Sequence, residues 1–454
     1  MVTYGFVIDN RKCIGCHACT VACKAENEVP IGVNRTWVKY IEKGEFPLTQ
    51  RRFSVMRCNH CADAPCVEIC PVTALYTRPD GIVDFDGRRC IGCKACMQAC
   101  PYDAIYIDPN DQTAAKCNYC SHRTDVGLAP PCVTVCPTHA IICGDLDDPG
   151  SEITRLASRE AVQVRKPEKG TDPKLFYIEG DAASLDPTAA SPADSYLWSQ
   201  GGGETFETPR ALSGPAGPDP ASGLAGRLGG LARRVYDPPR ERMTWGWKVS
   251  LYILTKAVAA GAFAISLLAF GPGRPPGPMG WTGALLGLIF LGWTGFLLIR
   301  DLRRMDRFLY IFLRPQWRSW LVKGGYVLFG FGGVIALWII GGILGGRAFQ
   351  SALTWPGVAL SFLAAVYTTF LFAQAKGRDF WQSPLLSVHM LLHAVLAGGA
   401  ALLLFSPFFP AAAGARLKEI LLGGLGLSFL AFMGELFFPH PTKDARAAAQ
   451  MILR

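Results

Sequence analysis

The sequence predicts a two-part chain, in which a small α+β region is followed by an all-α bundle of about six transmembrane helices. Three observations support this prediction. All 17 cysteines lie within the first 143 of 454 residues, a Gly-, Pro- and Ala-rich stretch follows, and six long apolar stretches occupy the remainder. We expect a cysteine-rich domain at 1–180, a linker at 181–243 and a membrane domain at 244–454.

Sixteen of the cysteines form four quartets, and each quartet closes with a cysteine four positions after its third member. A C-x2-C-x2-C run places three thiolates around one iron–sulfur cubane, and the fourth cysteine, often followed by proline, reaches a different cluster. The quartets are Cys13, Cys16, Cys19 and Cys23; Cys58, Cys61, Cys66 and Cys70; Cys90, Cys93, Cys96 and Cys100; and Cys117, Cys120, Cys132 and Cys136.

If the ligands cross over as in two-cluster ferredoxins, the first and fourth quartets share two clusters, and the second and third share two more. The four sets would be Cys13, Cys16, Cys19 with Cys136; Cys117, Cys120, Cys132 with Cys23; Cys58, Cys61, Cys66 with Cys100; and Cys90, Cys93, Cys96 with Cys70. No set lacks a thiolate. We therefore expect four 4Fe-4S clusters in an α+β, ferredoxin-like double dicluster domain.

Two other uses of cysteine fit the pattern less well. A disulfide framework suits small secreted domains, and residues 1–10 do not read as a signal peptide. Four-thiolate zinc sites also use C-x2-C pairs. They rarely contain three cysteines spaced three positions apart with a fourth cysteine four positions later. We interpret Cys143, outside every quartet, as a buried free thiol. The motif histidines are expected beside the clusters or at the surface, and they are His17, His60, His122 and His139.

Short strand signals, YGFVID at 4–9 and AIYID at 104–108, flank the motifs. The region 181–242 is rich in Gly, Pro, Ala and Ser and predicts an extended tether with little structure of its own. Six apolar stretches of membrane-spanning length then follow, at 249–270, 281–299, 324–344, 357–375, 385–405 and 420–438. Tryptophans near their ends fit the aromatic belt of a membrane protein.

Charge divides along the same boundary. Residues 244–454 hold 18 Lys and Arg against 6 Asp and Glu, so the net charge of +9 comes from the membrane half. Nucleic-acid binding is not expected, because the first half has no basic stripe. Seventeen basic residues flank the linker-side ends of the spans and four flank the opposite ends. The positive-inside rule thus favours cytoplasmic clusters on a bacterial or archaeal cytoplasmic membrane. A periplasmic cluster domain stays open, since a folded domain can be exported with a signal-bearing partner.

The first half, over about residues 4–180, resembles the four-cluster ferredoxin-like subunits of complex iron–sulfur molybdoenzymes. The resemblance rests on the order of the quartets, on CNHCADAPCVEICPVTAL and on CPTHAIICGDLDDPGS. The membrane half is similar to the quinone-reactive subunit of polysulfide reductase, through TWGWKVSLYILTKAVAAGAF, RDLRRMDRFLYIFLRPQWRSWLVKG and VYTTFLFAQAKGRDFWQSPLL. Relatives usually carry the halves as separate chains, often with eight or more spans, whereas this chain fuses them and shows six.

Ionisable and polar groups in the spans are the candidates for handling quinone or protons. Lys256 lies about eight residues into its span, which is deep for snorkelling, and Tyr252 shares its helical face. His389 and His393 share another face and could bind quinone, relay protons or form a structural pair. Haem is not expected, because no other span offers an opposing histidine. Asp301, Tyr367 and Glu435 are weaker candidates. For Asp301, an ion pair with nearby arginines is at least as good an interpretation as a role in handling quinone or protons.

These features predict an electron-transfer and membrane-anchor subunit of a respiratory oxidoreductase, which links a molybdopterin-containing catalytic subunit to the quinone pool. The chain has no substrate chemistry of its own in this hypothesis, because it lacks a pterin-sized domain and a catalytic constellation. Its partners would be that subunit, lipid, quinone and further membrane or cytochrome subunits. One alternative is a redox-driven proton transporter with Lys256, His389 and Glu435 as relay. Another is a ferredoxin with an inert anchor.

Overall fold

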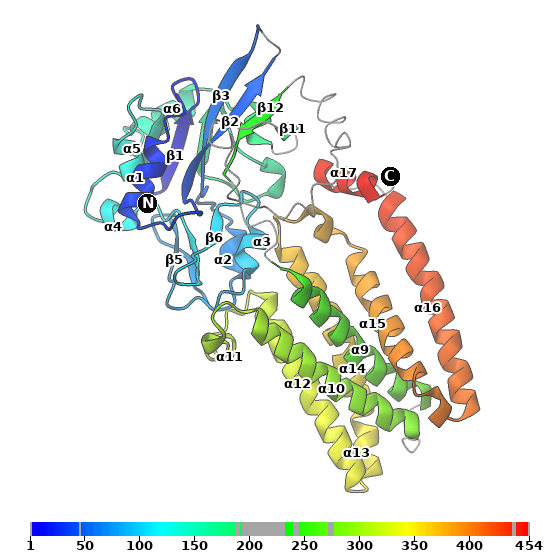
Figure 1. Cartoon of the computed structure of the whole chain (residues 1–454). Helices are drawn as coiled ribbons and strands as arrows, with labels where there is room; N and C mark the ends of the chain where they lie inside the picture. Colours follow the sequence, from blue (N-terminus) through cyan, green and yellow to red (C-terminus); the bar gives the residue numbers. More distant parts are fainter. Residues whose placement is uncertain are drawn as a thin grey trace, which may run out of the picture. The chain divides into compact units, whose positions relative to one another are not determined.

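The computed structural model describes residues 2–44, 47–186, 191–192, 232–238, 245–270, 277–437 and 442–452 (Figure 1). It forms two compact units. The first comprises 1–67, 75–87 and 100–242, and the second comprises 68–74, 88–99 and 243–454. Two short segments of the cysteine-rich region therefore fall in the same unit as the long helices, a division that differs from the three sequence ranges expected above.

Two four-stranded sheets organise the first unit. In one, β1 (Tyr4–Asp9) pairs in parallel with β10 (Leu175–Ile178) and antiparallel with β8 (Ile141–Asp145), and β9 (Val162–Gln163) pairs with β10. In the other, β2 (Thr36–Lys43) pairs with β3 (Gln50–Arg57). Two hairpins, β4 (Leu75–Thr77) with β5 (Val83–Phe85) and β6 (Ile105–Ile107) with β7 (Ala114–Lys116), complete the strands. Both sequence-predicted strands are present, as β1 and β6.

A short helix carries the third cysteine of each motif. These helices are α1 (Ala18–Glu26), α2 (Pro65–Ile69), α3 (Ala95–Ala99) and α5 (Pro131–Thr134), while α4 (Ser121–Thr124), α6 (Glu152–Arg159) and α7 (Ala182–Leu185) lie elsewhere in the same region. The first unit's core packs apolar side chains such as Phe6, Trp37 and Tyr177 together with Cys19 and Cys132. Most of the candidate ligands are thus buried, whereas Cys16 is exposed.

The predicted linker is partly structured where it is described. Within 181–243, β11 (Ser191–Pro192) and β12 (Arg233–Tyr236) extend the second sheet, with β12 antiparallel to β2. Trp37 Nε1 donates a hydrogen bond to Asp237 Oδ1 at 3.1 Å. Pairing with the open edge of β2 satisfies backbone groups that composition alone does not reveal. Most of the Gly-, Pro- and Ala-rich stretch lies outside the described residues.

Among the residues that the structure describes, the second unit contains six helices long and apolar enough to cross a membrane, as predicted. These are α9 (Trp247–Phe270), α10 (Pro278–Asp301), α12 (Trp320–Ile343), α14 (Thr354–Gln374), which follows α13 (Arg347–Ala352), α15 (Leu386–Leu403) and α16 (Ala411–Phe437); the shorter helices are α11 (Tyr310–Leu313) and α17 (Lys443–Ile452). Helix α16 begins nine residues before the predicted span, because the Ala-rich segment that precedes Ile420 has high helix propensity although it is less apolar.

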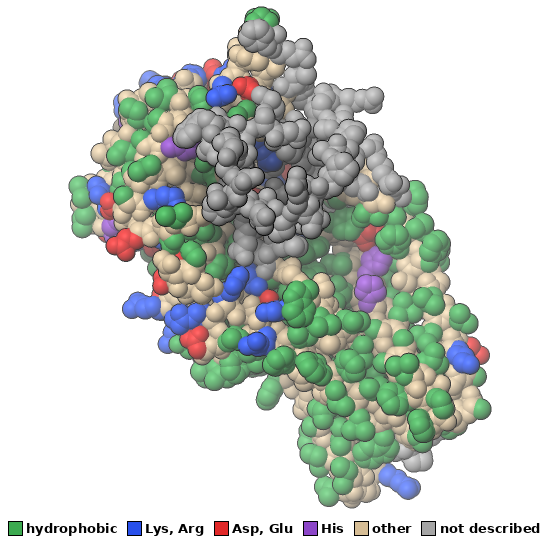
Figure 2. All heavy atoms as spheres, in the orientation of Figure 1, with side chains coloured by type: hydrophobic (Ala, Val, Ile, Leu, Met, Phe, Trp, Pro, Cys, Tyr) green, Lys and Arg blue, Asp and Glu red, His purple; other side chains and the backbone are tan. Residues whose placement is uncertain are grey.

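Helix α9 lies at the centre of the bundle, and α16 at its edge. The apolar window of α9 is 72% buried inside the structure, whereas that of α16 is 11% buried. Gly261 allows α15 to approach α9, since a Cβ there would lie 1.7 Å from Ala394 O. Small residues permit this close helix packing in membranes. Hydrophobic side chains cover most of the visible face of the helical part, as expected for lipid contact (Figure 2).

Candidate functional site

Thiols of the first and fourth motifs lie next to one another in the first unit. Burial raises the pKa of the Cys13 thiol, and the neighbouring thiolates of Cys136 and Cys16 raise it further. Burial also raises the pKa of Cys120 to about 11, with Cys132 and Cys23 as thiolate neighbours. The fourth cysteine of each motif is thus close to the other motif, as the crossing pattern predicts.

The second and third motifs show the same arrangement. Burial raises the pKa of the Cys61 thiol to about 12, with Cys58 and Cys100 adding to the rise. In the second unit, burial raises the pKa of Cys93, whose thiolate neighbours include Cys70 and Cys90. All seventeen cysteines are free thiols. Their ligand roles stay a prediction, and the neighbours match the sets expected.

Each motif turns in the same way before its second cysteine. The residues at this position are in the left-handed region, with φ of 71° at Gly15, 44° at His60, 67° at Gly92 and 63° at Tyr119. The turn directs a backbone N–H toward sulfur: His60 N donates to Cys58 Sγ at 3.5 Å and Gly92 N to Cys90 Sγ at 3.4 Å. Such a strained conformation at non-glycine residues is typical of functional loops.

A second N–H···S contact recurs four residues after the closing cysteine. Ala74 N donates to Cys70 Sγ, and Ala140 N donates to Cys136 Sγ, both at 3.2 Å. Hydrogen bonds to sulfur stabilise thiolates and tune the potentials of iron–sulfur clusters. Among the described residues no three His, Cys, Asp or Glu side chains converge on a single-ion position. A cubane instead needs one thiolate at each of its four irons, so the donor set fits that group.

In the described residues, the rings of three motif histidines contact groups other than the thiols. His60 is buried, and its Nδ1 accepts a hydrogen bond from Val83 N at 3.2 Å. His122 Nε2 and His139 Nε2 form hydrogen bonds with carboxylate oxygens of Glu26 and Glu152 at 2.8 and 3.1 Å. Cys143, expected to be buried, is half-buried, because its strand β8 lies beside β1 at the end of the sheet.

The third motif is held by the ends of the long helices, within the second unit. Trp245 Nε1 donates to Cys93 O at 3.0 Å, and Arg307 Nη1 donates to Cys90 O at 3.1 Å. Lys94 forms a 3.0 Å ion pair with Asp301, the last residue of α10. Sequence reasoning missed Trp245, Lys94 and Arg307, since nothing local links residues more than 150 positions apart.

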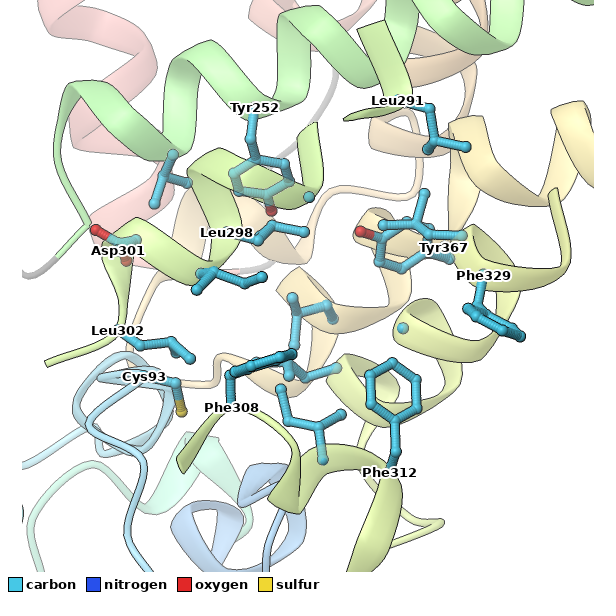
Figure 3. Close-up of a pocket in the computed structure, with 18 of the residues that line it drawn as sticks. Cys93, Tyr252, Leu291, Leu298, Asp301, Leu302, Phe308, Phe312, Phe329 and Tyr367 are labelled. Carbon is cyan, nitrogen blue, oxygen red and sulfur yellow. The ribbon is translucent and has the colours of Figure 1, made fainter. Parts of the chain in front are cut away.

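A pocket of about 300 Å³ opens beside Cys93, between α9, α10, α12 and α14. Figure 3 shows the hydroxyl groups of Tyr252 and Tyr367 directed into the same apolar space, with Asp301 and Cys93 toward one end. Apolar side chains form the rest of the wall, among them Leu291, Leu298, Phe308, Phe312 and Phe329. An apolar cavity with few polar groups is the usual form of a small-molecule site.

Lys256 lies behind this pocket rather than in its wall. It is 1% exposed, its Nζ donates to Ala365 O at 3.1 Å and to Thr368 Oγ1, and it lies 4.6 Å from the centre of the Tyr367 ring. In the described part of the chain it has no ion-pair partner. Thr368 is also a hydrogen-bond neighbour of Tyr252. Lys256 therefore reaches the pocket through Tyr367 and Thr368.

The remaining candidates form a separate group between α15 and α16. His389 Nε2 lies 3.0 Å from Glu435 Oε2, and the His393 ring is 6.4 Å from the His389 ring. None of the three lines the pocket. The structure thus brings Tyr252, Asp301 and Tyr367 together, places Lys256 behind them and leaves the histidine group apart.

Comparisons with known proteins match both halves of the chain. Residues 12–75 and 49–146 match models described as 4Fe-4S dicluster domain, and residues 238–437 match the model described as polysulphide reductase, NrfD. A subunit of tetrathionate reductase from Salmonella typhimurium is 45% identical over 202 residues, covering 43% of this chain and 80% of that protein.

Two further relatives match the same half. One of the chains of polysulfide reductase from Wolinella succinogenes is 40% identical over 189 residues, covering 40% of this chain and 97% of that protein. The arsenate respiratory reductase iron-sulfur subunit of a Shewanella species is 35% identical over 224 residues, covering 38% of this chain and 95% of that protein.

Proposed function

Because the protein belongs to the family of 4Fe-4S dicluster subunits of reductases and continues into an NrfD-type membrane domain, we propose that it is the electron-transfer and membrane-anchor subunit of a quinone-linked respiratory oxidoreductase. It is an integral membrane protein with iron–sulfur clusters. The proposal adds four clusters, a quinone site and a molybdopterin-containing catalytic partner.

The observation that carries the proposal is the position of Cys93. This candidate ligand lines an apolar pocket that also receives two tyrosine hydroxyls and has Asp301 at its edge. A quinone ring needs an apolar site with hydrogen-bond donors for its carbonyl groups, and it exchanges two electrons and two protons. The clusters supply one-electron transfer when bound. The pocket supplies the place where those electrons meet a membrane-soluble carrier.

The residues around the pocket divide the remaining tasks. The Tyr252 and Tyr367 hydroxyls donate hydrogen bonds to the carbonyl oxygens of the quinone and orient the ring. Asp301, held by Lys94, and Lys256, held by Thr368, provide groups that take up or return protons near those oxygens. Apolar residues of α10 and α12 exclude water and contact the ring and its tail.

A direct test uses the native complex, purified through a tag on this chain. We expect four 4Fe-4S clusters per chain from iron and sulfide content, a large partner with bound molybdenum, and quinol oxidation or quinone reduction by the complex. Iron content that fits two clusters or fewer, or a complex inactive with every quinone and quinol tried, would contradict the proposal.

The basic linker-side ends of the spans support a cytoplasmic cluster region. Protease accessibility in vesicles of known orientation tests this point. Cleavage of the cluster region in inverted vesicles alone is expected, and cleavage in right-side-out vesicles alone would place it in the periplasm instead.

A second function, proton translocation, is favoured by the pair of half-buried His389 and buried Glu435, which lies apart from the pocket. Two separated sites with ionisable groups are what a redox-driven proton pathway requires. Quinone turnover in proteoliposomes would change the internal pH if protons cross. A pH that stays constant, apart from the scalar protons of quinone chemistry, removes this function.

A further inference from the structure

Arg57 is a buried cation among the candidate cluster ligands of the first unit. It closes β3, directly before Cys58, and its side chain is 0% exposed. Its Nη1 donates to Cys132 Sγ at 3.2 Å, and its guanidinium lies 4.5 Å from the centre of the Phe6 ring. Phe6, on β1, thus holds one face of the guanidinium against the apolar core.

The guanidinium has thiols where a buried arginine usually has carboxylates. Among the described residues it forms no ion pair, and its Nε and Nη2 have no hydrogen-bond partner. An arginine side chain stays protonated in proteins, and the ionisable side chains around this guanidinium include Cys132, Cys117 and Cys19. A buried charge without a partner costs several kcal/mol. Its partner must therefore be the negative charge at these cysteines.

Those cysteines come from two different ligand sets of the crossing pattern. Cys19 falls in the set with Cys13, Cys16 and Cys136, whereas Cys117 and Cys132 fall in the set with Cys120 and Cys23. One arginine consequently faces both sets. The third motif also contains a buried cation, Lys94, but this side chain differs from Arg57 because it already forms an ion pair with Asp301.

We propose that Arg57 is a fixed counter-charge shared by the two clusters of the first and fourth motifs, and that it raises the reduction potentials of both. The inference rests on the cluster assignment made above. A cluster held by four thiolates carries net negative charge, and reduction adds one electron to it. An unscreened cation a few ångströms away stabilises the reduced form more than the oxidised form. Arg57 acts as a positioning and tuning residue, not as a ligand.

The test compares reduction potentials in the full-length protein, by redox titration monitored with electron paramagnetic resonance. We expect Arg57→Met to lower the equilibrium constant for one-electron reduction of the first- and fourth-motif clusters by tenfold or more, about 59 mV for each factor of ten. Arg57→Lys keeps the charge and should retain most of the potential. Arg78→Met is the matched control, because Arg78 is already paired with Asp80 and Asp125 and should leave every potential unchanged.

Five outcomes decide between the counter-charge and its alternatives. Wild-type protein that lacks these clusters overturns the proposed function and this inference together. Wild-type clusters with unchanged potentials in Arg57→Met overturn the inference alone. If Arg57→Met fails to retain the two clusters, Arg57→Lys decides: clusters retained at near-wild-type potentials support the counter-charge, and clusters equally lost overturn it. Equal shifts in the lysine and methionine variants also overturn it, since charge would then not matter.

Discussion

Replacing Lys256 by methionine should separate stability from function in the membrane half. The change removes an ammonium group that is 1% exposed and keeps a side chain of similar length. Because Lys256 contacts Tyr367 and Thr368 behind the pocket, we expect quinone chemistry to suffer while the fold survives.

The expected change in stability is small because large terms oppose one another. The two hydrogen bonds from the ammonium group contribute roughly 1.5–3 kcal/mol each, and its contact with the Tyr367 ring about 2 kcal/mol. Burying the ammonium costs several kcal/mol, and no carboxylate offsets this cost in the described part of the chain. We expect the free energy of unfolding to change by less than about 2 kcal/mol, given the size of these opposing terms.

Activity should change far more. A tenfold or larger fall in quinol oxidation, about 1.4 kcal/mol or more in the activation free energy, is expected if Lys256 exchanges a proton or orients Tyr367. The assays are thermal unfolding in detergent and steady-state quinol oxidation with an artificial electron acceptor, with cluster content measured in parallel.

Lys248→Met is the matched control, because Lys248 lies on the same helix at its linker-side end and donates to Arg300 O at 3.0 Å. It should leave both stability and activity unchanged. Wild-type activity in Lys256→Met would refute the reasoning and favour the inert-anchor hypothesis. A loss of activity that only follows a large loss of stability would also refute it.

Further predictions concern the clusters and the pocket. Cys93→Ser should remove one cluster and its paramagnetic signal and destabilise its neighbour, whereas unchanged iron content would contradict the ligand assignment. Gly15→Ala should lower the melting temperature and the cluster content, because its φ is +71° and a Cβ would lie 2.5 Å from the Phe53 ring. Gly32→Ala is the control for backbone strain alone, because Gly32 has a φ of +90° and open space around it. Equal effects of the two substitutions would show that the contact with Phe53 is not the cause. Asp301→Asn should slow quinol oxidation and remove the negative charge that pairs with Lys94. We expect a coupling of about 0.5–3 kcal/mol to Lys94→Met in a double-mutant cycle. Additive effects on stability would show that the ion pair contributes little.

The sequence predicts the parts of this protein that depend on local patterns. A cubane needs thiolates at short, regular spacings, so the four quartets are visible along the chain. The six spans follow in the same way from their length and hydropathy, although α16 begins nine residues before its predicted span because helix formation continues beyond the apolar stretch.

The pocket could not be predicted in the same way. Cys93, Tyr252 and Tyr367 come from distant parts of the chain, and the Lys94–Asp301 pair joins residues 207 positions apart. Helical periodicity correctly put Tyr252 and Lys256 on one face of α9, but it could not show that α14 supplies the facing tyrosine. It also could not show that His389 and Glu435 form a group of their own, since that depends on how α15 packs against α16.

The contacts around the third motif affect how the protein can be dissected. A fragment ending near residue 243 would contain all sixteen motif cysteines, yet Cys90 and Cys93 would lose the hydrogen bonds that Arg307 and Trp245 donate to their carbonyl groups. A fragment beginning near residue 244 would lose Cys93 from the wall of its pocket. Truncation at the apparent boundary would damage both products, so the two halves of this sequence are better studied as one inseparable piece.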